Sequence, residues 1–76
     1  MNNEKKRQPV NKELEKEKLI IENEVNKTRQ EMAVALNQFE VVTDPELIDY
    51  YTYTYKASIA KYGYLMKKLK KLYSKL

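Results

Sequence analysis

Residues 42–49 read Val-Thr-Asp-Pro-Glu-Leu-Ile-Asp and lie near the middle of this 76-residue chain. Thr43 and Glu46 have the spacing of a capping box, in which each side chain accepts a hydrogen bond from a backbone N–H at a helix start. Asp44 is the alternative cap, with Pro45 at the first helical position, where its missing N–H costs nothing. Pro45 also disfavours the α conformation at Asp44, so a helix arriving from upstream ends there. The stretch therefore predicts a helix, a tight turn and a second helix.

The segment before the turn, from about residue 11 to residue 41, has apolar residues at helical spacing, which predicts an amphipathic helix. The row is nearly a heptad seam, interrupted by Lys18 and Thr28. Its members are Leu14, Ile21, Val25, Thr28, Met32, Ala35, Leu36 and Phe39.

The start of the chain has a different composition. Residues 1–10 are polar and basic, and we expect a disordered arm there. Asn11 is the expected N-cap of the first helix, with Glu13 and Glu15 in its first turn.

The segment after the turn, from about residue 45 to residue 74, carries two apolar stripes, and it contains Gly63 at a cost of roughly 1 kcal/mol to a helix interior. A helix that is apolar on two sides needs two neighbours. The main stripe is Leu47, Tyr51, Tyr55, Ser58, Tyr62, Leu65, Met66, Leu69, Leu72 and Tyr73, flanked by Ile48 and Ile59. The second stripe, which we expect to be a protein interface, is Tyr50, Tyr53, Ala57, Ala60 and Tyr64.

The predicted fold is all-α, because a turn of about three residues (42–44) makes the two helices antiparallel neighbours in a coiled-coil-like hairpin. The chain is long enough for one small domain. One seam buries too little apolar surface to offset the cost of ordering about 60 residues, so we expect association, most simply a dimer that forms a four-helix bundle.

The composition removes most kinds of chemistry. The chain has no Cys and no His, and it shows no phosphate-binding loop or nucleophile–base pair, so we expect neither an enzyme, a cofactor, a metal nor a small-molecule substrate. Asp44, Glu46 and Asp49 fit the acidic first turns that helices prefer, although Asp49 lies beyond the cap. No apolar run predicts a membrane span or a secretory signal, so a cytoplasmic protein is expected.

The net charge of +4 is unevenly distributed. Residues 43–76 carry seven Lys against three acidic residues, and all the Lys follow the acids. Because both ends of an antiparallel hairpin lie together, we expect one basic pole opposite an acidic turn. The basic pole comprises Lys5, Lys6, Arg7, Lys67, Lys68, Lys70, Lys71 and Lys75.

Residues 35–67 resemble the YaaL-like family, small bacterial proteins of unknown function. The resemblance rests on Ala35-Leu36-Asn37-Gln38-Phe39, on Asp44-Pro45-Glu46-Leu47-Ile48-Asp49-Tyr50, and on Tyr53, Lys56-Ala57 and Lys61-Tyr62-Gly63-Tyr64-Leu65-Met66-Lys67. That family tends to have Glu and Arg where this chain has Ile59 and Lys61, so a charged pairing implied by the family would be missing here. The resemblance implies a short helical protein and no particular activity.

We expect a non-enzymatic interaction or adaptor protein whose partner is a second copy or another protein bound at the tyrosine-rich face. An alternative is a nucleic-acid- or ribosome-associated accessory protein that uses the basic pole. A third is peripheral membrane association through the basic amphipathic C-terminus.

Overall fold

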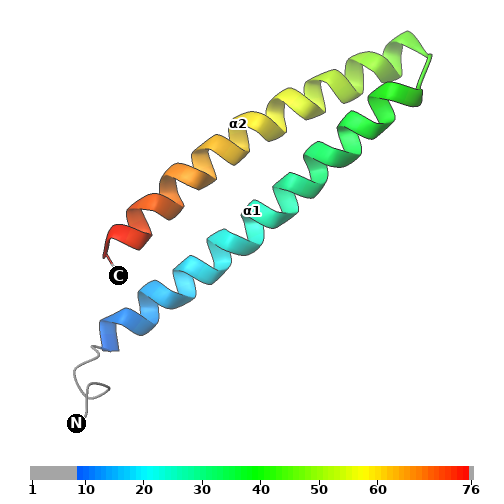
Figure 1. Cartoon of the computed structure of the whole chain (residues 1–76). Coiled ribbons are helices and arrows are strands. Elements are labelled where there is room, and N and C mark those ends of the chain that lie inside the picture. The colour runs from blue at the N-terminus through cyan, green and yellow to red at the C-terminus, as the bar shows by residue number, and fades with distance from the viewer. Residues whose placement is uncertain (1–8, 76) are drawn as a thin grey trace.

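The computed structural model describes residues 9–75, which form two long antiparallel helices joined by a short link (Figure 1). Helix α1 is Pro9–Val41 and helix α2 is Pro45–Lys75. The first residue of α1 and the last of α2 lie at the same end, which we call the open end. The predicted all-α helical hairpin is therefore the fold of the chain.

The start of α1 differs from expectation. The helix begins at Pro9, so Asn11 lies inside its first turn and is not the N-cap. Proline suits the first helical position because its φ is already helical and its missing N–H has no partner there anyway. As a result, the first turn contains no acidic residue, and Glu13 and Glu15 follow later. Residues 1–8 of the expected arm lie outside the described residues.

The link is as short as predicted. The last hydrogen bond of α1 runs from the Val42 N–H to the Gln38 carbonyl (3.0 Å). Asp44 then caps α2. The backbone N–H of Glu46 donates to Asp44 Oδ1 at 2.9 Å, and the Asp44 carbonyl accepts the first intrahelical bond from Ile48 N–H at 2.9 Å. Of the two predicted registers, the structure adopts the one with Pro45 at the first helical position.

The hydrophobic core lies in the half of the hairpin nearest the open end. Leu14, Tyr62 and Met66 pack around it at partial exposure. The covalent link holds the helices together at one end, and this cluster holds them together at the other. Its buried members are Ile21, Val25, Leu65, Leu69 and Leu72.

Small residues occupy the middle of the seam. Thr28 is fully buried at 0% exposure, and Ser58 and Ala35 are also buried. The Thr28 Oγ1 has no hydrogen-bond partner, although a buried hydroxyl ordinarily requires one. The middle of the seam therefore carries an uncompensated desolvation cost.

The apolar rows are only partly covered. Leu36 and Phe39 from the α1 row each remain 44% exposed, and Leu47 and Tyr73 from the α2 row are also exposed. Among the described residues, six hydrophobic side chains are buried and twelve large ones are exposed. Two helices touch along one line, so the side chains that flank this line stay open.

Replacing Thr28 with Val should stabilise the hairpin by about 1 kcal/mol, because it removes the unpaired hydroxyl and keeps the β-branched shape. Urea denaturation at one fixed protein concentration measures this change. Thr54→Val is the matched control, since the Thr54 hydroxyl donates to the Tyr50 carbonyl at 2.9 Å. A Thr28→Val protein less stable than the wild type would contradict this description of the seam.

Candidate functional site

The outer tyrosine face is the exposed stripe of α2 formed by Tyr50, Tyr53, Ala57, Ala60 and Tyr64. Its three tyrosines are 59%, 68% and 61% exposed, respectively. Helical spacing places all five residues on one side of α2, away from the buried Ser58 and Leu65. The structure therefore leaves the residues of the expected protein interface open to a partner.

Tyr50 lies where this face meets α1. Its ring packs edge-on against Tyr51, with ring centroids 4.9 Å apart at 78°. Beside it is a hollow of about 460 Å³, also lined by Val34, Glu31 and Thr54. The outer tyrosine face thus continues into a shallow depression between the two helices.

The opposite edge of the hairpin carries a second apolar surface that the sequence did not predict as a separate site. One pocket of about 180 Å³ there is lined by Leu36, Phe39 and Tyr55, and another hollow of about 420 Å³ is lined by Tyr62 and Met66. We call this surface, together with Ile59, the groove face: Leu36, Phe39, Tyr55, Ile59, Tyr62 and Met66.

Helical spacing connects the two hollows of the groove face. On α2, Tyr55 and Tyr62 are seven residues apart, and Ile59 lies between them at 45% exposure. On α1, Leu36 in the first hollow and Arg29 in the second are also seven residues apart. The two hollows are therefore successive parts of one groove between the helices.

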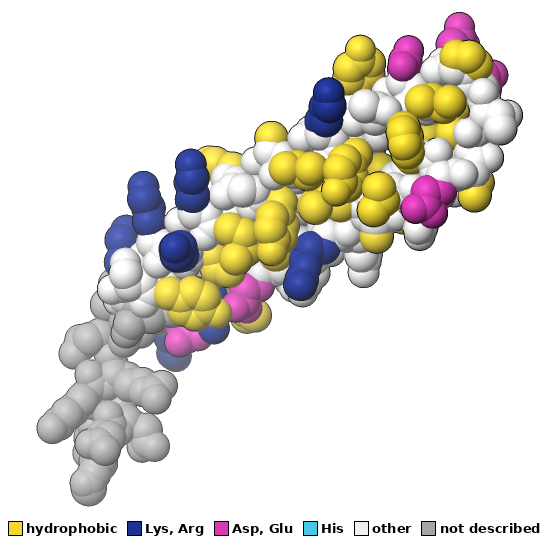
Figure 2. Space-filling view, turned by 45° about the horizontal axis from the view of Figure 1, so that its top comes forward, with side chains coloured by type: hydrophobic (Ala, Val, Ile, Leu, Met, Phe, Trp, Pro, Cys, Tyr) yellow, Lys and Arg dark blue, Asp and Glu magenta, His cyan; other side chains and the backbone are white. Residues whose placement is uncertain are grey.

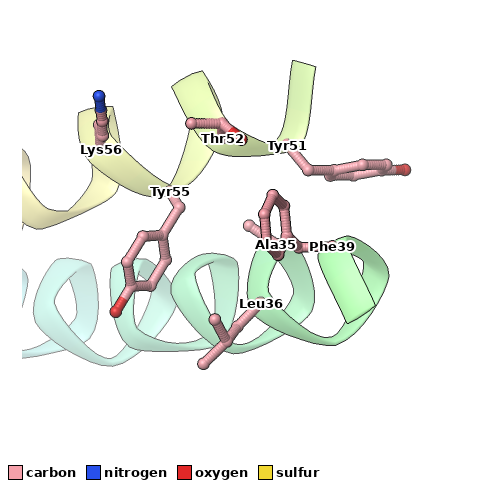
Figure 3. A pocket seen from close by; sticks show the side chains of 7 residues that line it. All are labelled: Ala35, Leu36, Phe39, Tyr51, Thr52, Tyr55 and Lys56. Carbon is pink, nitrogen blue, oxygen red and sulfur yellow. The ribbon is translucent and has the colours of Figure 1, made fainter. Parts of the chain in front are cut away.

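Figure 3 shows how the first hollow is built. The Tyr55 side chain extends from α2 toward α1, and the Phe39 ring lies between the two helices near Ala35. The Lys56 amine points away from α1. The walls of the hollow are consequently aromatic and aliphatic, with charge only at the rim.

The lysine end is the part of the basic pole that the structure describes. It is formed by the last three turns of α2, where every lysine is exposed. Lys68 lies over the Tyr64 ring, with its Nζ 5.8 Å from the centroid. Within residues 9–75 none of these lysines forms a salt bridge. The lysine end comprises Lys67, Lys68, Lys70, Lys71 and Lys75; Lys5, Lys6 and Arg7 lie outside the described residues.

Charge is segregated along the hairpin. Asp44, Glu46 and Asp49 are exposed at the turn, and the lysine end lies at the opposite extreme. Figure 2 shows acidic side chains at the turn and hydrophobic side chains along the face in view. The hairpin is therefore an electrostatically polar rod.

Lys61 has partners that the family resemblance did not predict. Its Nζ lies 3.7 Å from Glu24 Oε1 and 4.0 Å from Glu31 Oε1, both on α1. All three side chains are more than 40% exposed, so these ion pairs contribute little energy. They nevertheless give this lysine a position between the helices, in a chain where the charged pairing of the family pattern is missing because residue 59 is Ile.

Three side chains close the open end. The Tyr73 hydroxyl donates to Glu22 Oε2 at 2.7 Å, and Lys18 Nζ lies 5.4 Å from the Tyr73 ring centroid. Lys18 interrupts the apolar row in the sequence, and this contact with the ring gives it a place in the packing. The hydrogen bond to Glu22, followed by partial burial and the charges of Glu22 and Glu15, raises the pKa of Tyr73 above its ordinary value of 10.0.

The potential metal-ligating side chains of the described residues lie apart from one another. No group of three or more metal-ligating side chains comes together within residues 9–75. Over the same range, neither helix is long and apolar enough to cross a membrane. The surfaces that remain as candidate sites are the outer tyrosine face, the groove face and the lysine end.

A family model described as "Protein of unknown function (DUF2508)" matches residues 1–75, so the chain belongs to that family. No curated protein and no solved structure matches the chain.

The hydrogen bond at the open end predicts that Tyr73 loses its proton at a higher pH than an ordinary tyrosine. Below pH 10 the bond to Glu22 is intact, and its stabilisation is lost as the pH rises through the raised pKa of Tyr73. Tyrosinate absorbance during an alkaline titration should show a high-pH component that disappears in Tyr73→Phe and moves to lower pH in Glu22→Gln. Glu24→Gln is the matched control. A component that persists in both test variants would contradict the contact.

Proposed function

We propose that this member of the DUF2508 family is a non-enzymatic interaction or adaptor protein that binds a protein partner through its outer tyrosine face. The observation that carries the proposal is the set of three tyrosines on one side of α2, each about 60% exposed or more. The resemblance of residues 35–67 further supports a YaaL-like bacterial, cytoplasmic protein.

Tyrosines suit this role for a physical reason. A tyrosine ring supplies a large contact area at low entropic cost, and its hydroxyl supplies a polar contact. Ala57 and Ala60, between the tyrosines, are small enough to let a partner approach the helix closely. The face therefore combines large aromatic side chains, which can anchor a partner, with small side chains between them.

A second candidate function is nucleic-acid binding through the lysine end, as in a nucleic-acid- or ribosome-associated accessory protein. It is supported by the exposed lysines, for which residues 9–75 provide no acidic salt-bridge partner. A backbone of phosphates releases counterions when such side chains bind it, so the affinity falls steeply with salt. Anionic membranes attract the same charges, which keeps peripheral membrane binding as the third alternative.

Two sets of substitutions separate these functions. Tyr53→Ser with Tyr64→Ser should reduce co-purification of the protein partner at least tenfold, because it removes two contact anchors. Neutralising four lysines (Lys67→Gln, Lys68→Gln, Lys70→Gln and Lys71→Gln) should leave that partner bound. Quantitative affinity purification from the native cells measures both sets. Partner binding that survives the tyrosine substitutions would contradict the proposal.

Binding to nucleic acids at different salt concentrations tests the nucleic-acid alternative. At low ionic strength the wild type should bind duplex DNA, single-stranded DNA or RNA, with a logarithmic salt slope of about −3 to −4 if four lysines contact phosphates. The four-lysine variant should lose this binding, and vesicles with anionic lipid distinguish the membrane alternative. Absence of binding to all three nucleic acids would remove this function.

A further inference from the structure

We infer that the groove face is the contact surface of an antiparallel homodimer, in which the α2 helices of two copies lie side by side across a two-fold axis near Ile59. This surface lies on the opposite edge of α2 from the outer tyrosine face. The inference therefore concerns a different site from the proposed function, and each has its own test.

The groove face has the size that such a contact needs. Extended along the same side of α2 to Ile48 and Tyr73, which lie seven residues before Tyr55 and seven after Met66, the face is about 38 Å long at 1.5 Å per residue. Two helices packed side by side give it a width of about 18 Å, hence an area of about 700 Å². A stable interface buries about 800 Å² on each partner. The hollows lined by Leu36, Tyr55 and Met66 are depressions into which a second apolar surface can pack.

The charge distribution favours a second copy of the chain, in antiparallel orientation, as the partner on the groove face. The turn carries exposed Asp44, Glu46 and Asp49, and the other extreme carries the lysine end. An antiparallel copy brings each acidic turn next to the other's lysines, whereas a parallel copy would bring like charges together. The two-fold symmetry produces this pairing twice.

The register follows from positions counted from Ile59. Tyr55 and Gly63 lie four residues before and after it, so the bulky ring of one copy meets the glycine of the other. Asp49 and Lys70 lie ten residues before and eleven after, which places them at about the same height along the two helices, where they can pair at the rim of the interface. Both are exposed, and Asp49 is the acidic residue that the helix cap does not use.

The glycine at position 63 supports the same interface independently. A side chain added there would meet nothing within 4 Å, and the residue has no positive φ. The hairpin itself therefore has no need of glycine at this position, although glycine weakens a helix interior. Close approach of a second backbone, or of the partner's Tyr55 ring, explains it.

Sedimentation equilibrium over a wide concentration range, with helix content measured by circular dichroism, tests the dimer. The wild type should have twice the chain mass. Ile59→Glu should be a helical monomer, because it places two carboxylates at the two-fold axis. Ile20→Glu, a change at a 61% exposed isoleucine outside the groove face, is the matched control and should remain a dimer.

The register is tested by a charge exchange. Asp49→Lys and Lys70→Asp should each weaken the dimer about five- to tenfold, and the double variant should recover most of the affinity. Gly63→Gln should weaken it more than Ala60→Gln does.

A monomeric wild type at all concentrations would overturn the inference and leave the outer tyrosine face to its own test. A dimer that persists in Ile59→Glu, or a charge exchange without recovery, would overturn the groove-face register.

Discussion

Two helices packed side by side touch along one line on each, and this limit shapes the whole molecule. The seam buries a compact cluster around Ile21 and Leu69 near the open end and small residues such as Thr28 in the middle. Large side chains beside the line, such as Leu36, Phe39 and Ile59, stay exposed. Within residues 9–75 the hairpin therefore leaves more large hydrophobic side chains exposed than it buries, and its surfaces for partners result directly from its architecture.

The same geometry separates charge along the rod. Asp44 has to be at the turn because it caps α2, and acidic residues in a first helical turn oppose the helix dipole favourably. Lysines suit the other end of the same helix for the same reason. The preference for acidic residues at the start of α2 and for lysines at its end therefore gives the whole hairpin one acidic extreme and one basic extreme, and both are available to partners.

The sequence predicted the hairpin well, because Asp44 and Pro45 specify the break almost alone and the apolar rows are regular. It placed the start of α1 wrongly, since the preference of Pro9 for the first helical position outweighed the cap expected at Asn11. It also missed the groove face. Periodicity gives the direction of a side chain such as Leu36 around its helix, but not how far the neighbouring helix reaches over it. Only the packed structure shows which residues of a row are left at the edge.

We propose that this hairpin completes its apolar burial on a second chain. The most direct test is the free energy of unfolding by urea as a function of total protein concentration. If folding is coupled to dimerisation, a hundredfold increase in concentration should raise the apparent stability by about 2.7 kcal/mol per dimer, and the midpoint should rise with it. A midpoint that stays constant over that range would contradict the claim, because it would show that association does not stabilise the folded chain.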